Sequence, residues 1–129
     1  MRMAVEKIEY NNGDIYVTGV TDIGAVKGIW RHREPPMAEH IYFFELNIDQ
    51  IDRREIFVIQ GERPRASVHC HDGYVTFEGV CEEIDDVYVI RFAEDWIEMV
   101  SVSNDDFTIK KGDFLSFSQG CEKIGIYPY

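Results

Sequence analysis

The chain has 129 residues, of which 45% are hydrophobic and 13% aromatic, a composition that suits a folded core and excludes a disordered chain. Asp and Glu number 24 against 13 Lys and Arg, which gives a formal net charge of −11. No apolar run approaches the roughly 18 residues that a membrane-spanning helix needs, and Met1-Arg2-Met3 leads into no signal-like segment. Three cysteines without C-x-x-C spacing fit a reducing compartment. We therefore expect one compact cytoplasmic unit with no membrane partner.

Two β-hairpins are the clearest local predictions. Asn12-Gly13 and Asp72-Gly73 supply the two positive φ angles that a type I′ turn needs. Two-residue loops pair Ile8 with Val17 in the first hairpin and Val68 with Phe77 in the second. One face of each hairpin is then apolar, which is typical of strands with one side against a core. The apolar positions are Ile8, Tyr10, Ile15 and Val17, and Val68, Cys70, Val75 and Phe77.

The two hairpins also align with each other at an offset of 60 residues. Residues 8–20 lie against residues 68–80 without a gap, with glycine at positions 13 and 73 and again at 19 and 79. This predicts internal repeats over residues 1–61 and 62–129. The alternative is convergence, because short hairpins with the same turn chemistry resemble one another.

Short β-branched and aromatic runs separated by turns continue along the chain. The predicted strands are Val26–Arg31, Ile56–Gln60, Val87–Phe92, Trp96–Val102, Phe114–Ser118 and Lys123–Tyr127. Residues 36–53 carry an apolar spacing of three and four, so we expect at most one short helix there. Strand propensity favours a strand over Ile41–Ile48. The predicted fold is mostly β, a small closed barrel or sandwich of SH3-like or OB-like kind built from two pseudo-repeats.

The order of these elements and the stretch Lys111-Gly-Asp-Phe-Leu-Ser-Phe-Ser resemble the small barrels of tandem oligonucleotide- or oxyanion-binding modules. The resemblance is one of fold pattern, so it implies no site residues.

Motifs for catalysis or cofactors are sparse. His69 and His71 alternate on one predicted strand and could hold a transition metal, but a third ligand is missing, so we predict an exposed strand face and no metal. Cys70 belongs to the core face, and no His lies beside Cys81 or Cys121 in the sequence. G-x-x-x-x-G-K, H-E-x-x-H and G-x-S-x-G are absent. We expect no cofactor and a protein that is not an enzyme; an enzyme of unrecognised type is the further alternative.

Charge is unevenly distributed. Residues 1–65 carry 9 basic and 11 acidic residues, a net of −2, whereas residues 66–129 carry 4 basic and 13 acidic residues, a net of −9. We expect the acidic excess on a turn or loop after Val80 and on the turn that joins two later strands, with Trp96 exposed as an aromatic anchor. It is carried by Glu82, Glu83, Asp85 and Asp86 and by Glu94, Asp95 and Glu98.

These eight residues form the predicted docking surface for a basic protein partner. Inhibitors of basic enzymes, immunity-type proteins and regulatory adaptors share this electrostatic logic, which is an analogy and not a resemblance in residues. Solvated loops are the simpler explanation of the same residues. The alternative function is a barrel that binds a small molecule or an anion.

Nucleic acid and self-association are two further partners to weigh. Arginines concentrate between residues 31 and 65 beside aromatic side chains, as single-strand binding needs, but the net charge opposes binding to phosphates, so we expect no nucleic acid. The less acidic first half and the acidic second half could complement each other between subunits in a homo-oligomer. The arginines are Arg31, Arg33, Arg53, Arg54, Arg63 and Arg65.

Overall fold

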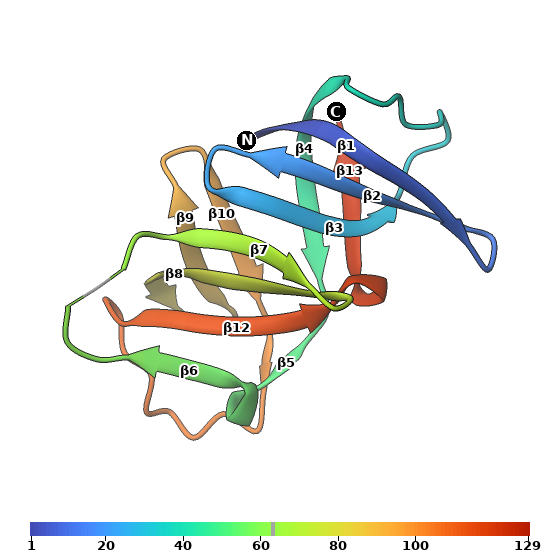
Figure 1. The fold of residues 1–129 in the computed structure, drawn as a ribbon. Helices are drawn as coiled ribbons and strands as arrows, with labels where there is room; N and C mark the ends of the chain where they lie inside the picture. The colour runs from blue at the N-terminus through green and yellow to red at the C-terminus, as the bar shows by residue number, and fades with distance from the viewer. Residues whose placement is uncertain (63) are drawn as a thin grey trace.

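The computed structural model describes residues 1–62 and 64–129. Arg63, one of the clustered arginines, lies outside the described residues. The described chain forms thirteen strands and two three-residue 3-10 helices (Figure 1). The elements are β1 Arg2–Asn11, β2 Asp14–Thr21, β3 Gly24–Trp30, β4 Ile41–Ile48, β5 Ile51–Asp52, η1 Arg53–Glu55, β6 Ile56–Ile59, β7 Ser67–His71, β8 Tyr74–Ile84, β9 Tyr88–Ala93, β10 Trp96–Val100, β11 Val102–Ser103, β12 Phe114–Gly120, η2 Cys121–Lys123 and β13 Ile124–Pro128.

Both predicted hairpins are confirmed in turn and in register. Asn12 and Gly13 have φ angles of 51° and 82°, and Asp72 and Gly73 have φ angles of 49° and 79°. Ile8 faces Val17 across β1 and β2, as predicted. The second hairpin keeps the same register 60 residues later, with Val68 opposite Phe77 across β7 and β8.

Eleven of the strands form a closed barrel and an open sheet, while β5 and β11 pair in parallel as a separate two-stranded sheet. The barrel order is β1-β2-β3-β13-β4, and the pairing of β4 with β1 closes it. The second sheet has the order β10-β9-β8-β12-β6, with β7 paired to β8 beside this path. The predicted mostly-β fold with a small closed barrel is confirmed. The strand predicted over Ile41–Ile48 is β4, and residues 36–52 form no helix; the 3-10 helix η1 begins at Arg53.

The barrel and the open sheet exchange strands through the two 3-10 helices. The chain leaves β4 in the barrel, passes through β5 and η1, and enters the other sheet as β6 beside β12. In return, β12 runs through η2 into the barrel as β13, which pairs with β4 (Figure 1). Each half of the chain thus supplies its last strand to the other half's sheet, so the two sheets are tied together covalently twice. The repeat origin of the halves stays a prediction.

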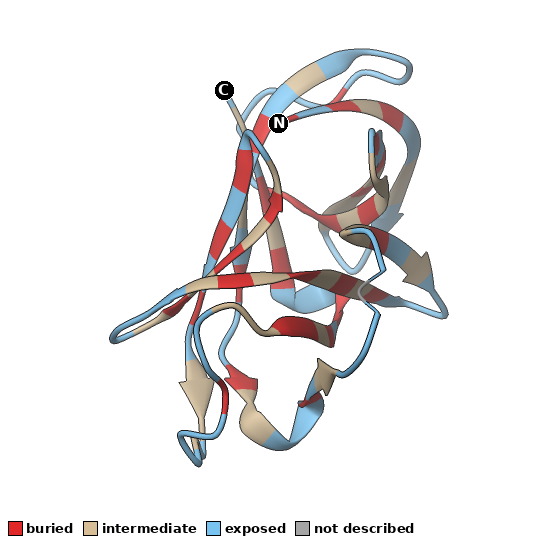
Figure 2. Cartoon of the chain, turned by 90° about the vertical axis from the view of Figure 1, so that its left-hand side faces the viewer, coloured by how far each residue is buried: buried red, intermediate tan, exposed pale blue. Residues whose placement is uncertain are grey.

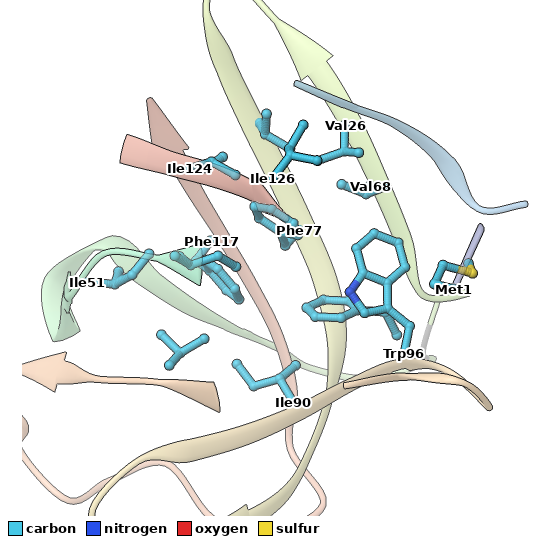
Figure 3. Close-up of a cluster of buried hydrophobic side chains, with 14 of the residues drawn as sticks. Met1, Val26, Ile51, Val68, Phe77, Ile90, Trp96, Phe117, Ile124 and Ile126 are labelled. Atoms are coloured by element: carbon cyan, nitrogen blue, oxygen red, sulfur yellow. The ribbon is translucent and has the colours of Figure 1, made fainter. Parts of the chain in front are cut away.

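One hydrophobic cluster extends through both sheets. Buried and exposed residues alternate along most strands, so one face of each strand lines this core (Figure 2). Val17 and Val26 enter the cluster from the barrel, and Phe77 and Phe117 enter it from the open sheet, where their rings stack at 5.3 Å. Figure 3 shows side chains from both sheets meeting in this cluster.

Tyr10 departs from the predicted apolar face of the first hairpin. Its side chain is 74% exposed, whereas Val17 on the same face is fully buried. The reason is the length of the hairpin, whose tip reaches beyond the sheets in Figure 1. Residues near the turn therefore have no opposing layer to cover them.

Candidate functional site

A groove of about 610 Å³ lies between β4 and β10, where the barrel meets the open sheet. β1 pairs with β4 only over Ile41–Phe43, and the Phe44 amide donates to the carbonyl of Met1, where β1 begins. From Glu45 to Ile48, β4 therefore has a described strand neighbour on one edge only, β13. β10 is the terminal strand of the other sheet. The groove is the space between these two incomplete edges.

Strand alternation decides which side chains reach the floor of the groove. In β10, Trp96, Glu98 and Val100 are buried, while Ile97 and Met99 are exposed. Because successive residues of a strand point to opposite faces, Glu98 must share the inward face with Trp96. The carboxylate of Glu98 is thus carried into the junction of the two sheets.

The buried carboxylate is held by the indole of Trp96. Trp96 Nε1 donates a 2.7 Å hydrogen bond to Glu98 Oε2. Trp96 is 4% exposed and packs edge-on against Phe44, with ring centroids 5.5 Å apart. The prediction of an exposed aromatic anchor at Trp96 is therefore wrong: the indole belongs to the core, where Figure 3 draws it, and positions Glu98.

Burial sets the ionisation of Glu98. This residue is 7% exposed, and the resulting loss of hydration raises the pKa of the Glu98 carboxyl to about 7. The hydrogen bond from Trp96 opposes this rise in pKa, and the nearby charge of Glu45 adds to it. A carboxylate of this kind gains more from an incoming cation than an exposed carboxylate, because water screens it less.

The charged side chains in the described lining of the groove are all acidic. Glu45 and Asp95 join Glu98, and none of the described residues that line the groove is Lys, Arg or His. The α-amino group of Met1 lies 3.4 Å from the exposed Asp95 carboxylate. This α-amino group offsets one of the three carboxylates, so the groove keeps a negative potential, which favours a cationic ligand.

Exposed apolar side chains surround the groove on its outer side. Tyr127 lies on β13, opposite Glu45 of β4. Tyr129 follows β13, and its ring stacks with Phe43 at 6.1 Å. Ile97 and Met99 project outward from β10. We call this set the apolar rim: Phe43, Ile97, Met99, Tyr127 and Tyr129. An exposed apolar group of this kind beside charged residues is typical of protein interaction sites.

Five of the eight predicted docking residues form two groups at opposite ends of β9. Asp95, Trp96 and Glu98 line the groove. Asp85 and Asp86 form the exposed turn between β8 and β9.

The other predicted acidic residues lie outside the groove lining. Glu82 and Glu83 belong to β8, which runs to Ile84, so the predicted turn after Val80 starts later than expected. Glu82 is paired with Arg91, and the Glu83 carboxylate lies 3.4 Å from Lys111 Nζ. Glu94 is exposed in the β9–β10 turn, where its carbonyl accepts from Arg91.

The other candidate chemical residues stay apart. His69 and His71 are exposed on β7, and His71 Nε2 lies 3.1 Å from the exposed Asp72 carboxylate at the hairpin tip. Cys81 and Cys121 are buried, and burial raises the pKa of the Cys81 thiol to about 11. Over residues 1–62 and 64–129, no three His, Cys, Asp or Glu side chains converge to hold a metal ion.

Two of the clustered arginines serve the fold. Arg53 pairs with Asp106 and donates to the Ile56 carbonyl, and Arg54 pairs with Asp52. Asp52 also caps η1 by accepting from the Arg54 amide. These contacts secure the crossing from the barrel to the open sheet.

Comparison of the chain with protein families, curated proteins and solved structures finds no match. In the part of the chain that the structure describes, no helix has the length and apolar character to cross a membrane.

Sequence reasoning missed the barrel's contribution to the groove. Glu45, Tyr127 and Tyr129 line it, together with the predicted Asp95 and Glu98. Alternation in Ile41–Ile48 places Glu45 outward, but its meeting with β10 depends on the exchange of strands between the sheets. No local sequence pattern signals that exchange.

Proposed function

We propose that this protein is a non-enzymatic binding protein and that the groove between β4 and β10 receives a basic segment of a protein partner. The observation that carries the proposal is the lining of the groove: three carboxylates, Glu45, Asp95 and Glu98, against one cationic group among its described residues, the α-amino group of Met1. A Lys or Arg side chain of the partner would enter between the sheets and pair with Glu98.

The apolar rim supplies the second part of such an interface. Charged residues speed encounter and select the partner, whereas aromatic and aliphatic side chains supply most of the affinity. Phe43 and Tyr129 already stack with each other on the outer face, so little side-chain freedom is lost on docking. Inhibitory, immunity-type and adaptor roles all use such a surface.

The alternative function, small-molecule or anion binding, finds less support in this groove. An anion would face three carboxylates, and a small pocket that contains Arg31 and Lys123 also contains Asp49 and Glu122, so its charges balance. A small organic cation fits the lining of the groove, but it would leave the apolar rim uncovered.

The test is a binding measurement with two matched triple variants. The groove variant carries Glu45→Gln, Asp95→Asn and Glu98→Gln; the control variant carries Glu83→Gln, Asp85→Asn and Asp86→Asn, which removes the same charge from β8 and its turn. The probe is a short peptide in which Lys and Leu alternate, titrated by calorimetry at low and high salt.

We expect the wild type and the control variant to bind the peptide at low salt. The groove variant should bind at least about tenfold more weakly, because a charge-assisted contact to a buried group contributes roughly 1.5–3 kcal/mol. Equal binding by both variants would place the interaction outside the groove. Loss in the control variant alone would assign docking to Glu83–Asp86.

A further inference from the structure

A second pocket, of about 280 Å³, opens beside the connection from β3 to β4. This connection crosses the top right of Figure 1. Apart from Pro35, Met37 and Pro128, the pocket is lined by one acidic residue, the exposed Glu34, and by five residues with rings, Trp30, His32, His40, Tyr42 and Tyr129. None of the described lining residues is Lys or Arg.

The rings stand at steep angles to one another. The ring of Tyr42 meets Trp30 at 69° with centroids 5.0 Å apart, and the ring of His32 also meets Trp30 at 69°, at 6.4 Å. His40 packs against Tyr42 at 4.5 Å with an angle of 51°. Rings at these angles border the pocket in different orientations and do not form a flat stack.

Three polar atoms of these rings are already used by the connection itself. Trp30 Nε1 donates to the Glu34 carbonyl at 2.7 Å, and the Tyr42 hydroxyl accepts from the Met37 amide at 3.1 Å. His32 Nδ1 accepts from the Glu34 amide at 3.1 Å. The same bonds fix the shape of the pocket before any ligand arrives.

A ligand of this pocket therefore meets ring surfaces and a carboxylate more than free hydrogen-bonding groups. Neutral apolar ligands can use the rings, but they gain nothing from the negative charge of the exposed Glu34. A compact cation without N–H donors can use both, because aromatic faces attract cations and such a cation gives up little hydration. We propose that the pocket binds a quaternary ammonium group, either on a small molecule or on a trimethylated lysine side chain.

This site is separate from the acidic groove in its lining, except for Tyr129, which borders both. The proposal does not depend on the function assigned to the groove. A partner segment that lies over Tyr129 could engage both sites.

The test compares a cation with its neutral isostere on the full chain. Tetramethylammonium, choline and a trimethyl-lysine peptide are titrated at pH 8, followed by amide chemical shifts, against a peptide whose side chain ends in a tert-butyl group of the same shape. Glu34→Gln and Tyr129→Ala are the test variants. Tyr10→Ala is the matched control, because Tyr10 and Tyr129 are 74% and 73% exposed.

We expect shift changes at Trp30, His40 and Tyr42, and binding of the trimethylated group at least about tenfold tighter than that of the neutral isostere. Glu34→Gln and Tyr129→Ala should each weaken binding several-fold, and Tyr10→Ala should not. Choline binding as tightly as the peptide would identify a small-molecule site, whereas binding of the peptide alone would identify methylated lysine. Equal binding of the tert-butyl peptide, or shifts elsewhere in the chain, would overturn the proposal.

Discussion

The indole of Trp96 and the carboxylate of Glu98 lie on the same inward face of β10 and share a 2.7 Å hydrogen bond at the junction of the two sheets. Two residues that the sequence places in an acidic segment are thereby buried together. The bond satisfies the indole N–H, while burial keeps the Glu98 carboxyl partly protonated at physiological pH. We therefore expect both stability and the proposed binding of a basic segment to depend on the protonation of one side chain.

Glu98 should make the folded state less stable as pH rises from about 4.5 to 7. The pKa of the carboxyl is raised from 4.5 to about 7 in the folded state, so the folded chain holds a proton that the unfolded chain has lost, and stability falls across this window. The integrated effect is about 3 kcal/mol. Glu98→Gln keeps an oxygen acceptor for Trp96 and removes the titration.

Urea unfolding between pH 4 and pH 8 measures this effect. The Glu98→Gln variant should equal the wild type near pH 4.5 and exceed its unfolding free energy at pH 8. Glu6→Gln, a change at an exposed position of β1, serves as the control and should follow the wild type. A wild-type profile with the same slope as that of Glu98→Gln would contradict the prediction.

Much of the fold can be predicted from this sequence because its signals are local. Asn12-Gly13 and Asp72-Gly73 each determine a turn, and a two-residue turn determines the register of both strands. The alternation along Ile41–Ile48 determines which of its residues face inward. These signals act over a few residues, and the structure follows them closely.

The groove could not be predicted because it joins segments about 50 residues apart. In β10 both faces are apolar except for Glu98, so alternation does not say which face is buried. A carboxylate normally marks the exposed face of a strand. The neighbouring Glu94 and Asp95 likewise favour an exposed position for Trp96. The face of β10 that is buried depends on the barrel strand β4, which the exchange of strands places against β10.

Gly24 should be essential where the barrel meets the open sheet. Its φ is +132°, and a Cβ atom there would lie 1.8 Å from the carbonyl oxygen of Val68 in β7. The Val68 amide donates to the Ile23 carbonyl at the same point, so the backbones cannot separate without breaking this contact. We expect Gly24→Ala to lower the free energy of unfolding by about 3 kcal/mol or more, or to prevent folding altogether.

Gly112→Ala is the control that measures the cost of placing alanine at a positive φ without a steric clash. Gly112 has a φ of +96°, and a Cβ atom added there would meet no described atom within 4 Å, so alanine there should cost about 1–2 kcal/mol. Thermal unfolding of both variants gives the comparison. If Gly24→Ala and Gly112→Ala lowered stability equally, the backbones of β3 and β7 would be able to move apart at little cost.

Binding of a basic peptide in the groove should weaken as pH falls below about 7. A Lys side chain beside Glu98 favours the ionised carboxylate, so below the raised pKa of Glu98 each binding event must first release a proton. Affinity should then fall by up to about tenfold per pH unit and level off above pH 7. Calorimetry of the alternating Lys and Leu peptide in buffers of different ionisation enthalpy would detect the released proton directly.

Glu98→Gln distinguishes this linkage from other titrations. With no carboxyl to ionise, the variant should bind the peptide more weakly at pH 8 and release no proton at pH 6.5. Glu45 and Asp95 would still attract the peptide, so residual binding should keep its salt dependence while losing this pH dependence. If the variant kept the wild-type pH profile, the cation would be binding away from Glu98, and the buried carboxylate would serve the fold alone.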